Sequence, residues 1–203
     1  MDFHNAFKDR VLFSFREIKG DFPSFYRARL NNWQDKGYIR KIVRGYYIFA
    51  DLSVDEEVLF HIANRIYAPS YISLETALSH HGLIPEAVYA MTSVTTKRTY
   101  RHKTFLANFY YRTVAPAFFF GYDIIRKGNI IYKMAHAEKA LVDFFYFHPD
   151  IADEAAFESL RISPINFQRC EPRLLNEYGR RFGQARLSRR INQFVRYVEN
   201  VKP

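Results

Sequence analysis

The sequence predicts an α+β protein of two domains, a small one over residues 1–52 and a larger one over residues 53–203. Three observations predict this class. Helix signals and a hairpin follow each other within the first fifty residues, β-branched and aromatic segments separated by turn residues fill the middle, and helical periodicity returns from about residue 136. The larger domain is therefore expected to have a mostly antiparallel sheet followed by C-terminal helices.

The small domain is expected to begin with three helices. Residues 2–10 predict a short helix, and a brief apolar stretch after Val11 leads into a second helix that ends near Gly20. Pro23–Ser24 is a helix-start signal for the third, and Gly37 stands where a helix-closing glycine belongs.

Two short strands complete the small domain, within residues 38–49, and turn around Arg44–Gly45. Three helices followed by a hairpin is the element order of a winged helix-turn-helix, a DNA-binding fold. At 100° per residue, the third helix has an apolar stripe and an opposite outer face. The stripe consists of Tyr26, Leu30, Trp33 and Gly37; the outer face consists of Ser24, Ala28, Asn31 and Asp35, with Arg27 and Asn32 on its flanks.

The outer face of the third helix carries residue types that read DNA. Arginine pairs with guanine and asparagine with adenine, so Arg27, Asn31 and Asn32 are expected to contact bases, beside Ser24. The cations at the helix end and on the hairpin suit phosphate contact; they are Lys36, Arg40, Lys41 and Arg44. The alternative is a small helical domain with a solvated basic face. The element order, the closing glycine and the cationic hairpin together favour DNA recognition.

The larger domain is expected to start with two helices after a short linker at residues 51–53. Ser53 or Asp55 caps a helix to about Ile66, and Pro69 breaks the chain after it. A second helix is expected from Ser73, as its cap, to Gly82, with Leu74, Ala77 and Leu78 facing inward.

Strands and further helices follow. Strand-like segments lie at residues 87–101, 103–114, 118–128 and 129–135, with a hairpin turn at Lys127–Gly128–Asn129. Helices are predicted over residues 136–149 and 153–162. The basic segment 172–201 carries an apolar stripe with two arginines opposite it; the stripe is Leu187, Ile191, Phe194, Val195 and Val198, and the arginines are Arg189 and Arg196.

The charge is concentrated at the two ends of the chain. The net charge is +9 with a pI near 9.6, and residues 1–52 carry ten Lys/Arg against six Asp/Glu, while residues 173–203 carry eight against two. A basic balance of this kind is typical of nucleic-acid binding.

Cysteine and hydropathy indicate the compartment. Cys170 is the single cysteine, so no intrachain disulfide or CxxC metal knuckle exists, and a reducing cytoplasmic location is expected. No run approaches the roughly 18 apolar residues of a membrane span, and no secretion signal opens the chain, so no membrane partner is expected. Phosphate-loop and GxSxG sequences are also absent.

Four segments in this order resemble AbiEi-type antitoxins of bacterial type IV toxin–antitoxin and abortive-infection systems. The segments are YISLETAL (71–78), HHGLIPE (80–86), TSVTTKR (92–98) and AEKALVDFF (137–145), after a hairpin ending in RGYYIF (44–49). The likeness runs from about Phe13 to Phe147.

The resemblance implies a function in two halves. An N-terminal winged helix represses the protein's own operon at an inverted-repeat operator in double-stranded DNA, and a C-terminal domain counteracts a nucleotidyltransferase-like toxin. It implies no cofactor, no metal and no catalytic activity of the protein's own. One alternative is a one-component regulator whose C-terminal domain binds a small ligand.

Other clusters contain residue types that occur in metal-binding and nuclease sites. His80–His81 with Glu86, or His136 with Glu138 and Asp143, match no zinc spacing, and Glu138 and Lys139 are expected on a helix surface. A metal-dependent nuclease, with Asp123 and Lys133 on adjacent strands, is a less favoured alternative.

A second basic cluster, around residues 97–103, is expected to be either a solvated turn or a partner surface for phosphate or an acidic toxin face. Its cations are Lys97, Arg98, Arg101 and Lys103. The C-terminal Arg189 and Arg196 present a similar choice, between additional contact with the DNA backbone and contact with the toxin.

Overall fold

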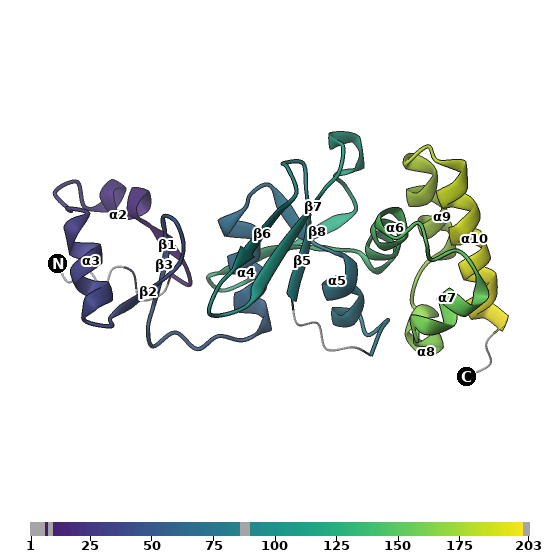
Figure 1. The fold of residues 1–203 in the computed structure, drawn as a ribbon, viewed down its shortest axis with the longest axis horizontal. Coiled ribbons are helices and arrows are strands. Elements are labelled where there is room, and N and C mark those ends of the chain that lie inside the picture. Colours follow the sequence, from purple (N-terminus) through teal and green to yellow (C-terminus); the bar gives the residue numbers. More distant parts are fainter. Residues whose placement is uncertain (1–6, 8–9, 86–89, 201–203) are drawn as a thin grey trace.

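The computed structural model describes residue 7, residues 10–85 and residues 90–200. The helix expected over residues 2–10 therefore lies almost wholly outside the described residues, and so do positions 87–89 of the first expected strand and Glu86 of one candidate metal set. Within the described ranges the protein is α+β, with a three-stranded sheet near the N-terminus, a six-stranded sheet in the middle and helices at the C-terminus (Figure 1).

Between residues 10 and 52 the N-terminal part contains two short helices and a small antiparallel sheet. Its elements are β1 (Phe13–Ser14), α2 (Phe15–Asp21), α3 (Ala28–Asp35), β2 (Ile39–Val43) and β3 (Tyr46–Phe49), with sheet order β1-β3-β2. Ser14 caps α2 through a reciprocal pair of bonds with Glu17. Gly37, at φ 73°, closes α3 as expected, and the N–H of Tyr38 donates to the Trp33 carbonyl at 2.9 Å.

The expected apolar stripe of the third helix is wrong at its first and last positions, because Tyr26 and Gly37 are both exposed and lie outside α3. Tyr26 is 74% exposed, because α3 begins at Ala28 and a count of 100° per residue does not apply before it. Phe25 takes the buried place instead, with its ring centroid 5.2 Å from that of Trp33. Leu30 is buried as expected.

The middle of the chain forms a mixed sheet. Its elements are α4 (Glu56–Ile66), β4 (Ser70–Ile72), α5 (Leu74–His80), β5 (Ala90–Thr95), β6 (Tyr100–Lys103), β7 (Asn108–Thr113), a 3₁₀ turn η1 (Pro116–Phe118), β8 (Tyr122–Lys127) and β9 (Ile130–Ala135). The strand order is β6-β7-β5-β4-β9-β8. Three of the described pairings are antiparallel, in line with the expected majority, whereas β5–β7 and β4–β9 are parallel.

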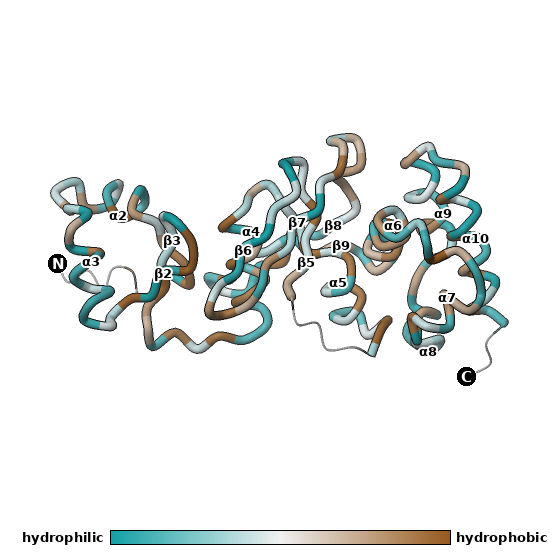
Figure 2. The backbone as a smooth tube through the Cα atoms, viewed as in Figure 1, coloured by the Kyte–Doolittle hydropathy of each residue, from teal (hydrophilic) through white to brown (hydrophobic). Residues whose placement is uncertain are grey.

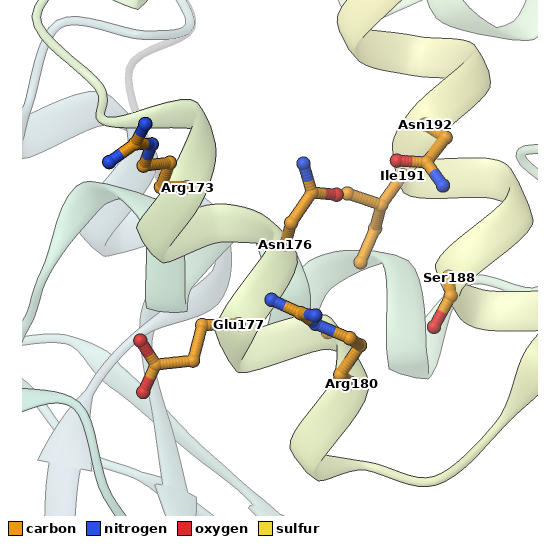
Figure 3. A pocket seen from close by; sticks show the side chains of 8 residues that line it. Arg173, Asn176, Glu177, Arg180, Ser188, Ile191 and Asn192 are labelled. Carbon is orange, nitrogen blue, oxygen red and sulfur yellow. The ribbon is translucent and has the colours of Figure 1, made fainter.

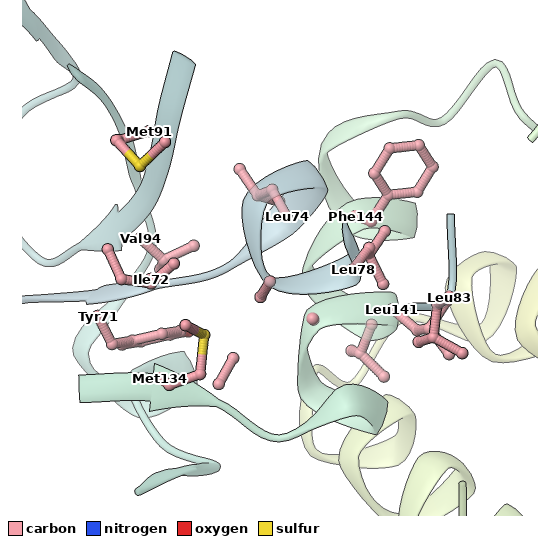
Figure 4. Packing of buried hydrophobic residues seen from close by; sticks show 14 of the residues in the cluster. Tyr71, Ile72, Leu74, Leu78, Leu83, Met91, Val94, Met134, Leu141 and Phe144 are labelled. Atoms are coloured by element: carbon pink, nitrogen blue, oxygen red, sulfur yellow. The ribbon is translucent and has the colours of Figure 1, made fainter. Parts of the chain in front are cut away.

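Helices cover both faces of this sheet. On one face the Tyr111 hydroxyl donates to the Ala63 carbonyl of α4 at 2.7 Å. On the other face Thr92 bonds to Thr76 of α5, and α6 (Ala137–Phe147) lies beyond α5. Figure 4 shows the apolar residues of α5 between the strands and α6. Because side chains alternate along a strand, neighbouring residues of β7 face different helical layers.

Four more helices end the described chain: α7 (Glu154–Ser159), α8 (Pro164–Phe167), α9 (Pro172–Arg181) and α10 (Ala185–Asn200). The expected stripe of α10 is buried at every position, and Arg189 and Arg196 are exposed. Figure 2 shows apolar α6 between the sheet and these more hydrophilic helices. In the part of the chain that the structure describes, no helix has the length and apolar character required to cross a membrane.

Candidate functional site

The residues expected to contact DNA are all exposed, and they lie on α3, at its two ends and on the β2–β3 hairpin. Asn31 and Asn32 lie on α3 itself, Lys36 ends it, Arg40 and Lys41 lie on β2, and Arg44 lies in the turn before β3. Ser24 and Arg27 were expected on the helix, but Arg27 is the residue before its first turn and Ser24 lies in the preceding bend. Both therefore stand beside the N-terminus of α3.

Most cations of this surface lie away from the carboxylates that the structure describes. Among the described residues, Arg27, Lys36 and Arg44 form no ion pair, and neither does Lys41. Arg27 lies over the Phe15 ring at 5.7 Å from its centroid, a contact that holds the guanidinium near the helix while its N–H groups stay exposed. Unpaired exposed cations are what contact with phosphate requires.

Arg40 is an exception within this surface. Its guanidinium carbon lies 3.4 Å from the centroid of the Phe105 ring, which belongs to the β6–β7 connection. Arg40 thus helps to hold the hairpin against the middle of the molecule. A guanidinium stacked in this way still presents its N–H edge, so phosphate contact remains compatible with the packing.

The N-terminal part is joined to the rest of the protein by an ion pair and by shared core. Arg65 of α4 donates to the Glu17 carboxylate at 2.5 Å. Four apolar residues of the N-terminal part are buried in the same cluster as the large sheet; they are Val11, Leu12, Ile42 and Ile48. Around this junction, Arg10, His61 and Asn129 line a cavity of about 390 Å³.

The second basic cluster is divided between a turn and one face of a strand. Lys97 and Arg98 lie in the turn before β6, whereas Arg101 and Lys103 lie on β6 itself, and all four are exposed. In the register of β6 and β7, Arg101 lies opposite Tyr110, and both side chains are on the sheet face toward α5. The alternate residues Tyr100 and His102 turn to the opposite face, beside other aromatic rings.

The C-terminal helices carry a polar groove between α9 and α10. It has a volume of about 630 Å³ and is lined from α9 by Arg173, Asn176, Glu177 and Arg180 and from α10 by Ser188 and Asn192 (Figure 3). Gly179 and Ile191 also line it, and the helices meet closely there, because a Cβ added at Gly179 would lie 2.9 Å from Ile191. Arg189 and Arg196 are not among the groove's lining residues.

The residue pattern does not predict a buried ionisable cluster in α6. Lys139 is completely buried, and Glu138 is 7% exposed, so the expectation that both lie on a helix surface is wrong. The Lys139 ammonium donates to Asp143 and, at 2.8 Å, to the Tyr71 hydroxyl. Helical periodicity in AEKALVDFF cannot reveal this, because α6 has the sheet on one side and the C-terminal helices on the other.

Burial moves both partners of this pair toward neutrality. Desolvation lowers the pKa of Lys139 and raises the pKa of Asp143, and their mutual attraction opposes both changes. Asp143 also accepts from Tyr71 and Ser73 at 2.8 Å each. Ser73 stands at the start of α5 as expected, but its hydroxyl bonds Asp143 instead of capping the helix. The cluster is a satisfied structural network.

The candidate metal and nuclease residues have other partners. His136 bonds the Tyr178 hydroxyl at 2.9 Å, while Glu138 accepts from the Glu171 N–H at 2.7 Å. In the β8–β9 hairpin, Asp123 pairs with Met134 and Lys133 with Ile124. Asp123 and Lys133 therefore project from opposite faces of the sheet and are not brought together.

Comparison with known proteins gives no assignment: the chain matches no protein-family model and no curated protein.

Proposed function

We propose that the protein is a DNA-binding transcriptional autorepressor and antitoxin of a type IV toxin–antitoxin operon, and that residues 1–52 act as a winged helix-turn-helix. One observation carries the DNA-binding half. α3 and the β2–β3 hairpin together present exposed amide and cationic side chains, and the cations have no ion pair among the described residues. In a double helix, α3 enters the major groove and the hairpin follows the phosphates.

The antitoxin half is supported by the resemblance of residues 71–78, 80–86, 92–98 and 137–145 to AbiEi-type antitoxins. In this proposal the functional partner is a nucleotidyltransferase-like toxin, the operator is an inverted repeat, the compartment is the cytoplasm, and the protein itself catalyses no reaction. Lys97, Arg98, Arg101, Lys103, Arg189 and Arg196 are the exposed cations available to a partner.

Two measurements test the proposal separately. Fluorescence anisotropy compares binding of the DNA upstream of the protein's own coding sequence with binding of a shuffled duplex; we expect tighter binding of the upstream DNA by at least about a thousandfold. Equal affinity for both duplexes contradicts the repressor. Co-expression with the neighbouring gene tests the antitoxin, since we expect growth inhibition by that gene to be relieved; continued inhibition contradicts it.

A further inference from the structure

A cavity of about 350 Å³ lies where the helical layer of the large sheet stops short of the β6–β7 edge. Thr92 of β5 bonds to Thr76, so α5 covers the sheet as far as that strand. Beyond it, the register places Thr92 beside Tyr110 and Tyr110 beside Arg101 on the same face. These side chains form the floor of the cavity, and the end of α6 forms a wall. The volume is within the range of small-molecule sites.

Two guanidinium groups line this cavity without a carboxylate partner among the described residues. The Arg101 guanidinium carbon lies 4.9 Å from the centroid of the Tyr110 ring, and that of Arg112 lies 4.6 Å from the centroid of Phe147. Arg112 is half-buried. A guanidinium stacked on a ring keeps its N–H edge free, and that edge binds phosphate oxygens through two parallel hydrogen bonds.

The opposite wall offers hydrogen-bond acceptors. The Glu75 carboxylate lies 3.7 Å from His148 Nε2, whose other ring nitrogen donates to the Phe144 carbonyl at 2.9 Å. Among the described residues Glu75 has no other ion pair, so its carboxylate can accept from donors of a ligand. With two arginines against one carboxylate, the lining favours a ligand that combines an anionic group with N–H or O–H donors.

The cavity wall also contains a strained residue. Leu74 has φ 57°, in the left-handed region that a branched side chain rarely adopts. The preceding residue, Ser73, fixes the backbone at this point through two hydrogen bonds. The Ser73 N–H donates to the Thr92 carbonyl at 3.2 Å, and the Ser73 hydroxyl donates to Asp143. Strain of this kind is concentrated at ligand sites.

We propose that this cavity binds a mononucleotide. The phosphate lies on Arg101 and Arg112, the base stacks on Tyr110, and Glu75 accepts from a base amino group or a ribose hydroxyl. Both arginines and Tyr110 line one cavity of small-molecule size, which α5 and Phe147 border on the side away from β6. This site is separate from the DNA surface of α3 and shares only Arg101 with the cations offered to a toxin partner, so it goes beyond the proposed function.

Isothermal titration of the full chain tests the site with AMP, GMP, CMP and UMP, with adenosine and inorganic phosphate as partial ligands. We expect saturable one-to-one binding of at least one mononucleotide, and binding at least tenfold weaker for both partial ligands. Arg101→Gln and Arg112→Gln should each weaken binding by about tenfold or more, since each removes a charged hydrogen-bond donor. Arg126→Gln, at an exposed position of β8 outside the cavity, should leave binding unchanged.

Three results overturn the proposal: no saturation with any mononucleotide at about 1 mM, equal affinity for adenosine or for phosphate alone, or full affinity in Arg101→Gln. Arg101 is exposed, so its variant decides the matter even where Arg112→Gln fails to fold. Binding of a single-stranded oligonucleotide that no mononucleotide displaces also overturns it.

Discussion

Asp143 lies one helical turn after Lys139 in α6, and the two completely buried side chains are hydrogen-bonded to each other. Tyr71 joins both, as acceptor from Lys139 and donor to Asp143. Removing one charge from such a pair leaves the other buried without compensation, whereas removing both leaves only the neutral hydroxyls of Tyr71 and Ser73 in the site. Single and double variants of the pair should therefore differ in their free energy of unfolding.

Asp143→Leu should lower the free energy of unfolding by about 3–5 kcal/mol, because the Lys139 ammonium is left unpaired. The double variant Lys139→Met/Asp143→Leu should recover much of this loss. Urea denaturation measures both. A loss below about 1 kcal/mol in the single variant, or a double variant less stable than the single one, contradicts the network as described.

Gly121 lies against the same lysine. It has φ 74°, and a Cβ added there would lie 3.0 Å from Lys139 Cγ, whereas at Gly128, with φ 57°, no atom is within 4 Å. Both alanine variants incur the left-handed backbone cost of about 1–2 kcal/mol. Gly121→Ala should lose about 1 kcal/mol or more beyond that, from overpacking. Equal unfolding free energies for the two variants would show that Lys139 moves aside freely.

Glu17 should make stability depend on pH through its pair with Arg65. Burial alone would raise the pKa of Glu17, but hydrogen bonds from Ser14 and Arg65, with the charge of Arg65, outweigh it and lower the pKa below 4.5. A lowered folded pKa means that the contribution is present above pH 4.5 and is lost as the pH falls through the folded value.

The matching measurement compares the wild-type protein with Glu17→Gln by urea denaturation across acidic pH. Since both side chains are partly exposed, the difference at neutral pH should be no more than about 1 kcal/mol, and it should shrink below pH 4.5. A difference that stays constant down to pH 3 would assign the effect to something other than the ionised carboxylate.

Arg27 and Arg44 should contribute to DNA binding in different ways, Arg27 to sequence specificity and Arg44 to affinity for any sequence. Arg27→Ala, beside the N-terminus of α3, should relax operator specificity by about 1–3 kcal/mol. Arg44→Ala, in the hairpin turn, should weaken binding to operator and random DNA alike and reduce the slope of log affinity against log salt by about one. Anisotropy titrations at several salt concentrations measure both, with Arg126→Ala as control. Equal loss on both DNAs for both variants would remove this division of roles.

The residue pattern predicts features that depend on a few neighbouring residues. Asp55 caps α4 through the Val58 N–H at 2.9 Å and that helix ends at Ile66, both as expected. The hairpin at Gly128 and the closing glycine of α3 are also as expected. The parallel pairing of β5 with β7 was not expected, because β7 also pairs with the edge strand β6 and lies between β6 and β5, an arrangement that neighbouring residues do not determine.

The candidate sites also combine features that the local sequence determines with features that depend on distant parts of the chain. The sequence by itself determined which cations are exposed on α3, the hairpin and α10, because helix periodicity and turn chemistry are local. Only the tertiary structure decided that Lys139 is buried, that Phe25 replaces Tyr26 in the core, and that Arg101 and Arg112 line one cavity with Glu75. Those three outcomes depend on which surfaces meet, and the partners of each surface are distant in the chain.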